Sequence, residues 1–80
     1  MIKESAIVQN GVVYTGRRHH DVIRKIVETT GIRPVTGEQG FVTDDGRFVS
    51  REEAAKIALS CGQIQKLTFH SRELFSEDLY

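Results

Sequence analysis

The fold of this chain is decided by residues 40–62, GFVTDDGRFVSREEAAKIALSCG, which predict a β-hairpin followed directly by a helix. The turn Asp44-Asp45-Gly46 separates two short apolar runs, as a hairpin requires. Ser50 stands three residues before Glu53, the spacing of a capping box, in which the two side chains satisfy free backbone amides of the first helical turn. We therefore predict a helix over residues 51–61.

The same plan occurs earlier in the chain. Asn10-Gly11, the dipeptide best suited to a two-residue hairpin turn, lies between the apolar runs 6–9 and 12–15. Apolar side chains then recur at helical spacing up to Gly31, which suits a left-handed helix cap. These features predict a second hairpin and a helix over about residues 18–30.

Together these segments predict a single α+β domain spanning residues 1–80, built from two β-hairpin-helix units in the order ββαββα around an antiparallel sheet. The segment 63–80 is too apolar for a disordered extension. We expect it to pack on the sheet or on a second subunit, with Leu67-Thr68-Phe69 as a candidate fifth strand.

Composition limits the possible functions. A chain of 80 residues buries only about 60–65% of its unfolded surface, so self-association would add needed stability and we expect a homo-oligomer. Eleven basic and eleven acidic side chains cancel, which argues against a nucleic-acid-coating protein. The lone Cys61 and the lack of a secretory pattern or long apolar run predict a cytoplasmic protein without a membrane partner.

A cluster of basic residues, Gly16-Arg17-Arg18-His19-His20-Asp21, marks the start of the first predicted helix. The free amides of a helix N-terminus attract anions, and arginine adds paired donors that fit phosphate. Arg17 and Arg18 are therefore candidate phosphate ligands, with His19 or His20 assisting. The alternative is an ion-pair cluster in which a carboxylate such as Glu77 or Asp78 balances the charge.

The two adjacent histidines do not predict a metal site, because neighbouring helical residues point about 100° apart. We expect neither a metal nor a cofactor. No serine lies in a nucleophile-elbow pattern and no paired-carboxylate motif appears, so a binding protein is favoured over an enzyme. Nucleotide hydrolysis with His19 or His20 as general base stays as a third hypothesis.

Aromatic residues offer a second kind of ligand contact. Tyr14, Phe41 and Phe48 are candidates for stacking on a base, although each is as well explained as part of the core. A nucleotide-like small molecule is therefore one candidate partner.

The C-terminal residues combine apolar and acidic side chains, a composition that suits docking on a host protein. The candidate interface residues are Leu74, Phe75, Glu77, Asp78 and Tyr80. The alternative is that this segment completes the core of its own domain.

The chain resembles a group of small phage and prophage proteins at GRRHH (16–20), GFV (40–42), GRFVSREEA (46–54) and LFSEDL (74–79). The resemblance spans nearly the whole length and implies a phage protein that acts in the host cytoplasm. Small phage proteins of this kind often counter host defence, some by sequestering a nucleotide immune signal and others by blocking a host protein. The resemblance thus implies an anti-defence sponge as the first hypothesis and a host-protein inhibitor as the second.

Overall fold

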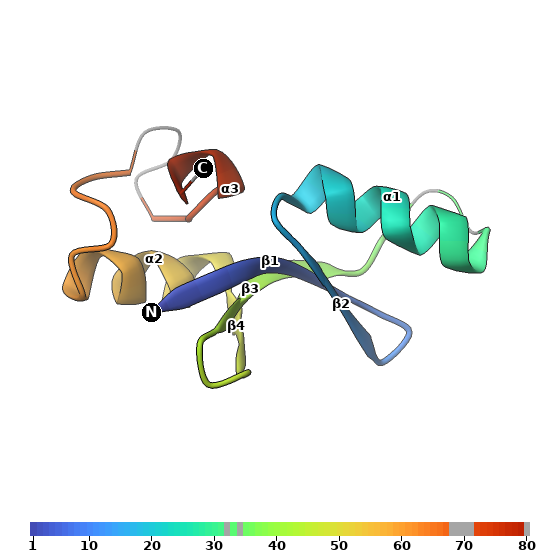
Figure 1. Ribbon diagram of the computed structural model, residues 1–80, viewed down its shortest axis with the longest axis horizontal. Helices are drawn as coiled ribbons and strands as arrows, with labels where there is room; N and C mark the ends of the chain where they lie inside the picture. Colours follow the sequence, from blue (N-terminus) through green and yellow to red (C-terminus); the bar gives the residue numbers. More distant parts are fainter. Residues whose placement is uncertain (32, 34, 68–71, 80) are drawn as a thin grey trace.

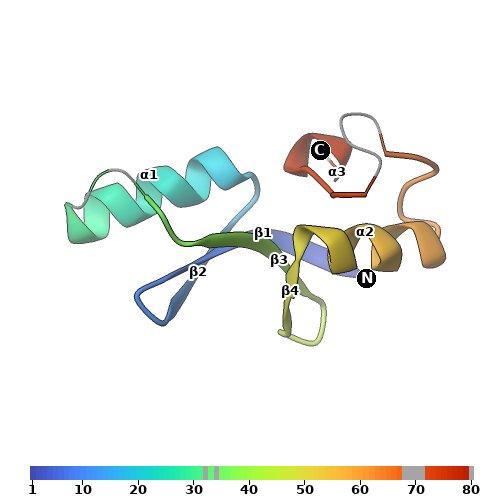
Figure 2. The ribbon, with the colours of Figure 1, turned by 180° about the vertical axis from the view of Figure 1, so that it is seen from behind.

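The computed structural model describes residues 1–31, 33, 35–67 and 72–79. Its elements are β1 (Ile2–Gln9), β2 (Val12–Gly16), α1 (His19–Thr30), β3 (Glu38–Thr43), β4 (Phe48–Ser50), α2 (Arg51–Ser60) and α3 (Ser76–Leu79). This order confirms the predicted α+β class and the two hairpin-helix units, with a short C-terminal helix added. Figures 1 and 2 show α1 and α2 at opposite ends of the sheet, with α3 beside α2.

All four strands form one antiparallel sheet in the order β2-β1-β3-β4. The first hairpin turns at Asn10 and Gly11, whose φ angles of 52° and 77° are those of a tight two-residue turn. Strand β1 pairs with both β2 and β3, so it joins the two hairpins into one sheet. Its register with β3 shifts between Ile2 and Glu4, where β1 carries one extra residue.

Local capping fixes both long helices close to their predicted limits. Helix α1 is closed by Gly31 in the left-handed region (φ 72°), whose amide donates to the carbonyl oxygen of Val27 at 2.8 Å. Helix α2 begins after Ser50, whose hydroxyl oxygen accepts from the Glu53 amide at 3.1 Å. The predicted serine cap is therefore confirmed.

Both long helices cover the same face of the sheet, here called the helix face. In β1, Ser5 and Ile7 point to one side because alternate residues share a face. Ile7 packs under α1, and Ser5 pairs with Phe41, which packs under α2. The opposite side, here called the open face, carries the alternate residues of the strands, among them Glu4, Ala6 and Val8 of β1.

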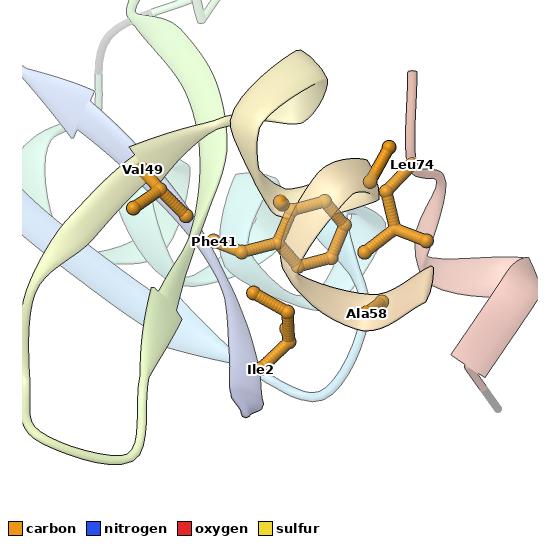
Figure 3. Packing of buried hydrophobic residues seen from close by; sticks show 7 residues of the cluster. Ile2, Phe41, Val49, Ala58 and Leu74 are labelled. Carbon is orange, nitrogen blue, oxygen red and sulfur yellow. The ribbon is translucent and has the colours of Figure 1, made fainter. Parts of the chain in front are cut away.

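The core is divided between the two helices. Phe41 lies at the centre of the larger cluster, and Figure 3 shows its ring among Ile2, Val49, Ala58 and Leu74. The alanines of α2 let this helix approach the sheet closely. The smaller cluster consists of Val22 and Ile26 of α1 together with Ile7 of β1.

The C-terminal segment packs back on the domain, as predicted. Leu74 is fully buried in the larger cluster, and its amide donates to the carbonyl oxygen of Arg51 at 3.0 Å. The predicted fifth strand is not supported at Leu67, which lies outside any strand. Its other two members, Thr68 and Phe69, lie outside the described residues.

Candidate functional site

The predicted anion site at the start of α1 is divided between surface and core. Arg17, Arg18 and His20 are exposed, whereas His19 is buried. Asp21 accepts a hydrogen bond from the Arg18 amide through Oδ2 at 3.3 Å, so an acid of the same turn balances part of the positive charge. The cluster is therefore not a single convergent group of four ligands.

His19 joins three elements of the fold. Its Nε2 lies 2.7 Å from the carbonyl oxygen of Gly40 in β3, and its Nδ1 lies 3.0 Å from Oγ of Ser76 in α3. Since a carbonyl can only accept, the proton sits on Nε2 and Nδ1 accepts from the serine. The ring also meets Phe41 edge-on, with centroids 4.9 Å apart. A ligand that used His19 would have to displace one of these partners.

The surroundings of His19 keep its imidazole neutral. Burial, followed by the nearby positive charge of Arg51, lowers the pKa of His19 from 6.5 to about 4, although the Gly40 hydrogen bond and the Glu77 carboxylate partly oppose the change. Glu77 thus lies close enough to His19, the first residue of α1, to act on its charge.

This lowered pKa predicts a loss of stability in mild acid. In the unfolded state His19 takes up a proton as the pH falls below 6.5, whereas in the folded state it takes one up only near its lowered pKa of about 4. Between these values a lower pH favours the unfolded state, so the free energy of unfolding falls as the pH falls. We expect the titration of His19 to lower the free energy of unfolding by about 2 kcal/mol between pH 7 and pH 5. Denaturant unfolding at both values should show a flatter pH dependence in His19→Gln.

The matched control is His20→Gln, which alters an exposed histidine and should keep the wild-type slope. An unchanged slope in His19→Gln would show that this imidazole is not held neutral.

Arg51, which was not predicted from the sequence as a site residue, binds the C-terminal segment to the start of α2. Its Nη1 donates to the carbonyl oxygen of Leu74 at 2.8 Å, and its Nη2 donates to Oε1 of Gln39. The guanidinium carbon also lies 4.7 Å from the centre of the Phe75 ring. The only signal in the sequence was the position of Arg51 at the first residue of a capped helix.

A groove of about 890 Å³, here called the α1 groove, runs along the outer side of α1. Its half-buried floor consists of Ile23, Val27 and Val35, and its exposed rim consists of His20, Arg24, Glu28 and Arg33. Three cationic or basic side chains thus surround an apolar floor with one acid among them. Such a surface can hold a ligand that combines an anionic group with a flat apolar part.

Of the predicted ligand residues, only His20 lines the α1 groove. Arg24 and Arg33 were missed, although Arg24 follows His20 by one helical turn and its Nη2 lies 3.1 Å from His20 Nε2. Arg33 comes from the loop after α1, and no local pattern indicates that this loop faces the helix.

The predicted aromatic contacts lie elsewhere. Tyr14 is half-buried against the smaller core cluster, and Phe41 is fully buried in the larger one. Phe48 pairs with Val42 on the open face, where its ring lies against Gly40.

The predicted interface residues of the C-terminal segment are partly buried in their own domain. Leu74 is fully buried, Phe75 and Asp78 are half-buried, and Glu77 is exposed. Tyr80 lies outside the described residues.

Residues 1–80 match the family model described as "Phage T4 y16D protein". The chain belongs to the phage T4 y16D protein family. No curated protein and no solved structure matches it. The expectation of a small phage protein is therefore confirmed.

Three further observations on this y16D family member concern a nucleophile–base pair, metal ligands and membrane-spanning helices. Ser76 and His19 have the atoms of a nucleophile and a base, but both are buried and the second imidazole nitrogen contacts a carbonyl. Among the described residues, no three His, Cys, Asp or Glu side chains converge as metal ligands. No helix in the described part of this chain has the length and apolar character needed to cross a bilayer.

Proposed function

We propose that this phage protein is a binding protein that sequesters a nucleotide-like, phosphate-bearing molecule in the α1 groove. The observation that carries the proposal is the combination, in one groove, of a cationic rim with an apolar floor. Its volume of about 890 Å³ lies within the range of small-molecule sites, roughly 300–1,000 Å³.

Each part of the groove has a role in this proposal. Arg24 and Arg33 donate paired hydrogen bonds to phosphate oxygens, which guanidinium groups fit well. Ile23, Val27 and Val35 contact the face of a base, since aromatic ring faces pack favourably on apolar side chains. The Glu28 carboxylate accepts a hydrogen bond from a base amine or sugar hydroxyl.

Arg17 and Arg18 keep a secondary role in the proposal. They are exposed just before α1 and add positive charge near the His20 end of the groove. Such charges raise the rate at which an anionic ligand arrives more than they strengthen its binding. The proposal thus assigns the phosphate contacts to Arg24 and Arg33 and not, as predicted from the sequence, to Arg17 and Arg18.

Sequestration agrees with membership of a phage family and with the enclosed position of the Ser76–His19 pair, which favours binding over turnover. Capture of a host protein through the C-terminal segment has less support, because that segment places Leu74 in the core. An anti-defence sponge is therefore the function we propose for this chain.

A thermal-shift screen tests the proposal against cyclic dinucleotides, cyclic trinucleotides and ADP-ribose. A ligand at 100 times its dissociation constant adds about 2.7 kcal/mol, or roughly 10 °C in a domain of this size. We expect Arg24→Ala/Arg33→Ala to abolish this shift and Arg17→Ala/Arg18→Ala to reduce it only in part.

The control is Arg47→Ala/Lys56→Ala, which removes two positive charges outside the groove and should keep the full shift. A full shift in Arg24→Ala/Arg33→Ala would contradict the assigned site. Recovery of a chemically altered ligand would contradict sequestration.

A further inference from the structure

The outer rim of the α1 groove carries two opposite charges on one helix. Arg24 and Glu28 are four residues apart, both are exposed and both line the groove. In the described part of the chain, Arg24 contacts His20 and no ion pair joins it to Glu28. The carboxylate of Glu28 is thus available to a partner outside its own helix.

This arrangement is complementary to itself. When two copies of a helix lie antiparallel about a two-fold axis, each residue meets one that lies equally far from the centre on the partner. With the axis level with Ile26, Arg24 lies about 3 Å to one side and Glu28 about 3 Å to the other, at 1.5 Å per residue. Each arginine then faces the glutamate of the other copy.

The groove itself is incomplete in one copy. Among the described residues, α1 lines the groove on one side and Arg33 and Val35 of the following loop line it on the other. A ligand held there stays largely open to solvent, whereas small-molecule sites usually cover about 70–90% of a ligand. A ligand at this site therefore needs a further protein surface to cover it.

We propose that a second copy of this chain docks along the outer rim of α1 in antiparallel orientation, with two symmetric Arg24–Glu28 ion pairs, and walls the α1 groove. The inference rests on the proposed function for its use of the groove as a ligand site. Because the two-fold axis is perpendicular to the plane of the paired helices, the two grooves open on the same side. The cationic rims of the two grooves therefore lie side by side in the pair.

Sedimentation velocity over a concentration series tests this pairing without any ligand. The wild-type mass should rise from 9.0 kDa toward twice that value as concentration increases. Arg24→Glu and Glu28→Arg each place like charges opposite each other and should weaken association about tenfold or more. The double swap Arg24→Glu/Glu28→Arg restores opposite charges and should restore association.

The matched control is the swap Glu52→Lys/Lys56→Glu, which exchanges the same pair of charges on α2 and should leave association unchanged. All variants change exposed helical residues, and circular dichroism verifies their folding. A wild-type chain that stays monomeric, or a double swap that associates no better than the single variants, overturns the inference.

The same preparations separate this inference from the proposed function. A monomeric wild-type chain that still binds a nucleotide in the thermal-shift screen overturns the pairing alone. A chain that pairs as predicted but binds no nucleotide supports the interface and contradicts the ligand.

Discussion

Replacing Gly40 by alanine is expected to lower the free energy of unfolding by at least about 3 kcal/mol. A Cβ atom at this position would lie 2.2 Å from the carbonyl oxygen of Val49 and 2.7 Å from Cζ of Phe48. The first contact is with backbone of the neighbouring strand, so β4 would have to move away from β3. Domains of this size have a total stability of roughly 4–12 kcal/mol.

Denaturant unfolding measures this effect, and Gly16→Ala is its control. The nearest atom to a Cβ at Gly16 is a methyl carbon of Val22 at 3.1 Å, and Asp21 Cβ and Val22 N lie at an ordinary 3.7 Å, so we expect a loss of about 1 kcal/mol or less. Equal stability of Gly40→Ala and the wild type would contradict the close pairing of β3 with β4.

Leu74→Ala should lower the free energy of unfolding by about 3 kcal/mol, because it leaves a cavity beside Phe41 and the alanines of α2. The neighbouring hydrogen bonds from Arg51 should weaken as the segment loosens. Thermal or denaturant unfolding measures the loss.

The control is Leu59→Ala, which removes the same number of atoms from a side chain that is 41% exposed on α2. That change should cost less than about 1 kcal/mol. A negligible effect of Leu74→Ala would instead indicate that the C-terminal segment is free to dock on a partner, as the interface hypothesis held.

Local chemistry made the elements predictable. Asn10-Gly11 and the serine cap at Ser50 have effects that act within a few residues, and both appear in the structure as expected. The pairing of β1 with β3 was not predictable, because it joins strands about 35 residues apart through contacts that no local pattern specifies. The extension of β1 to Ile2 was also missed, since the register shift interrupts its alternation.

The candidate site was less predictable than the fold. His19 and His20 are adjacent and looked equivalent, yet His19 falls on the buried stripe with Val22 and Ile26, a spacing that could have separated them. Arg24 lies within the predicted helix, but its place in the groove depends on the following loop, which brings Arg33 and Val35 next to α1. Such a groove is a product of tertiary structure, so charge clusters in the sequence indicated its neighbourhood and not its residues.

The most direct test of the binding account is an NMR titration of the ¹⁵N-labelled protein with cyclic dinucleotides, cyclic trinucleotides and ADP-ribose. The account predicts that at least one of them shifts the amide signals of residues 20–28, 33 and 35, with little change in α2. Shifts confined to α2 or to the open face, or no shift with any of these compounds, would contradict the assignment of the α1 groove as a nucleotide site.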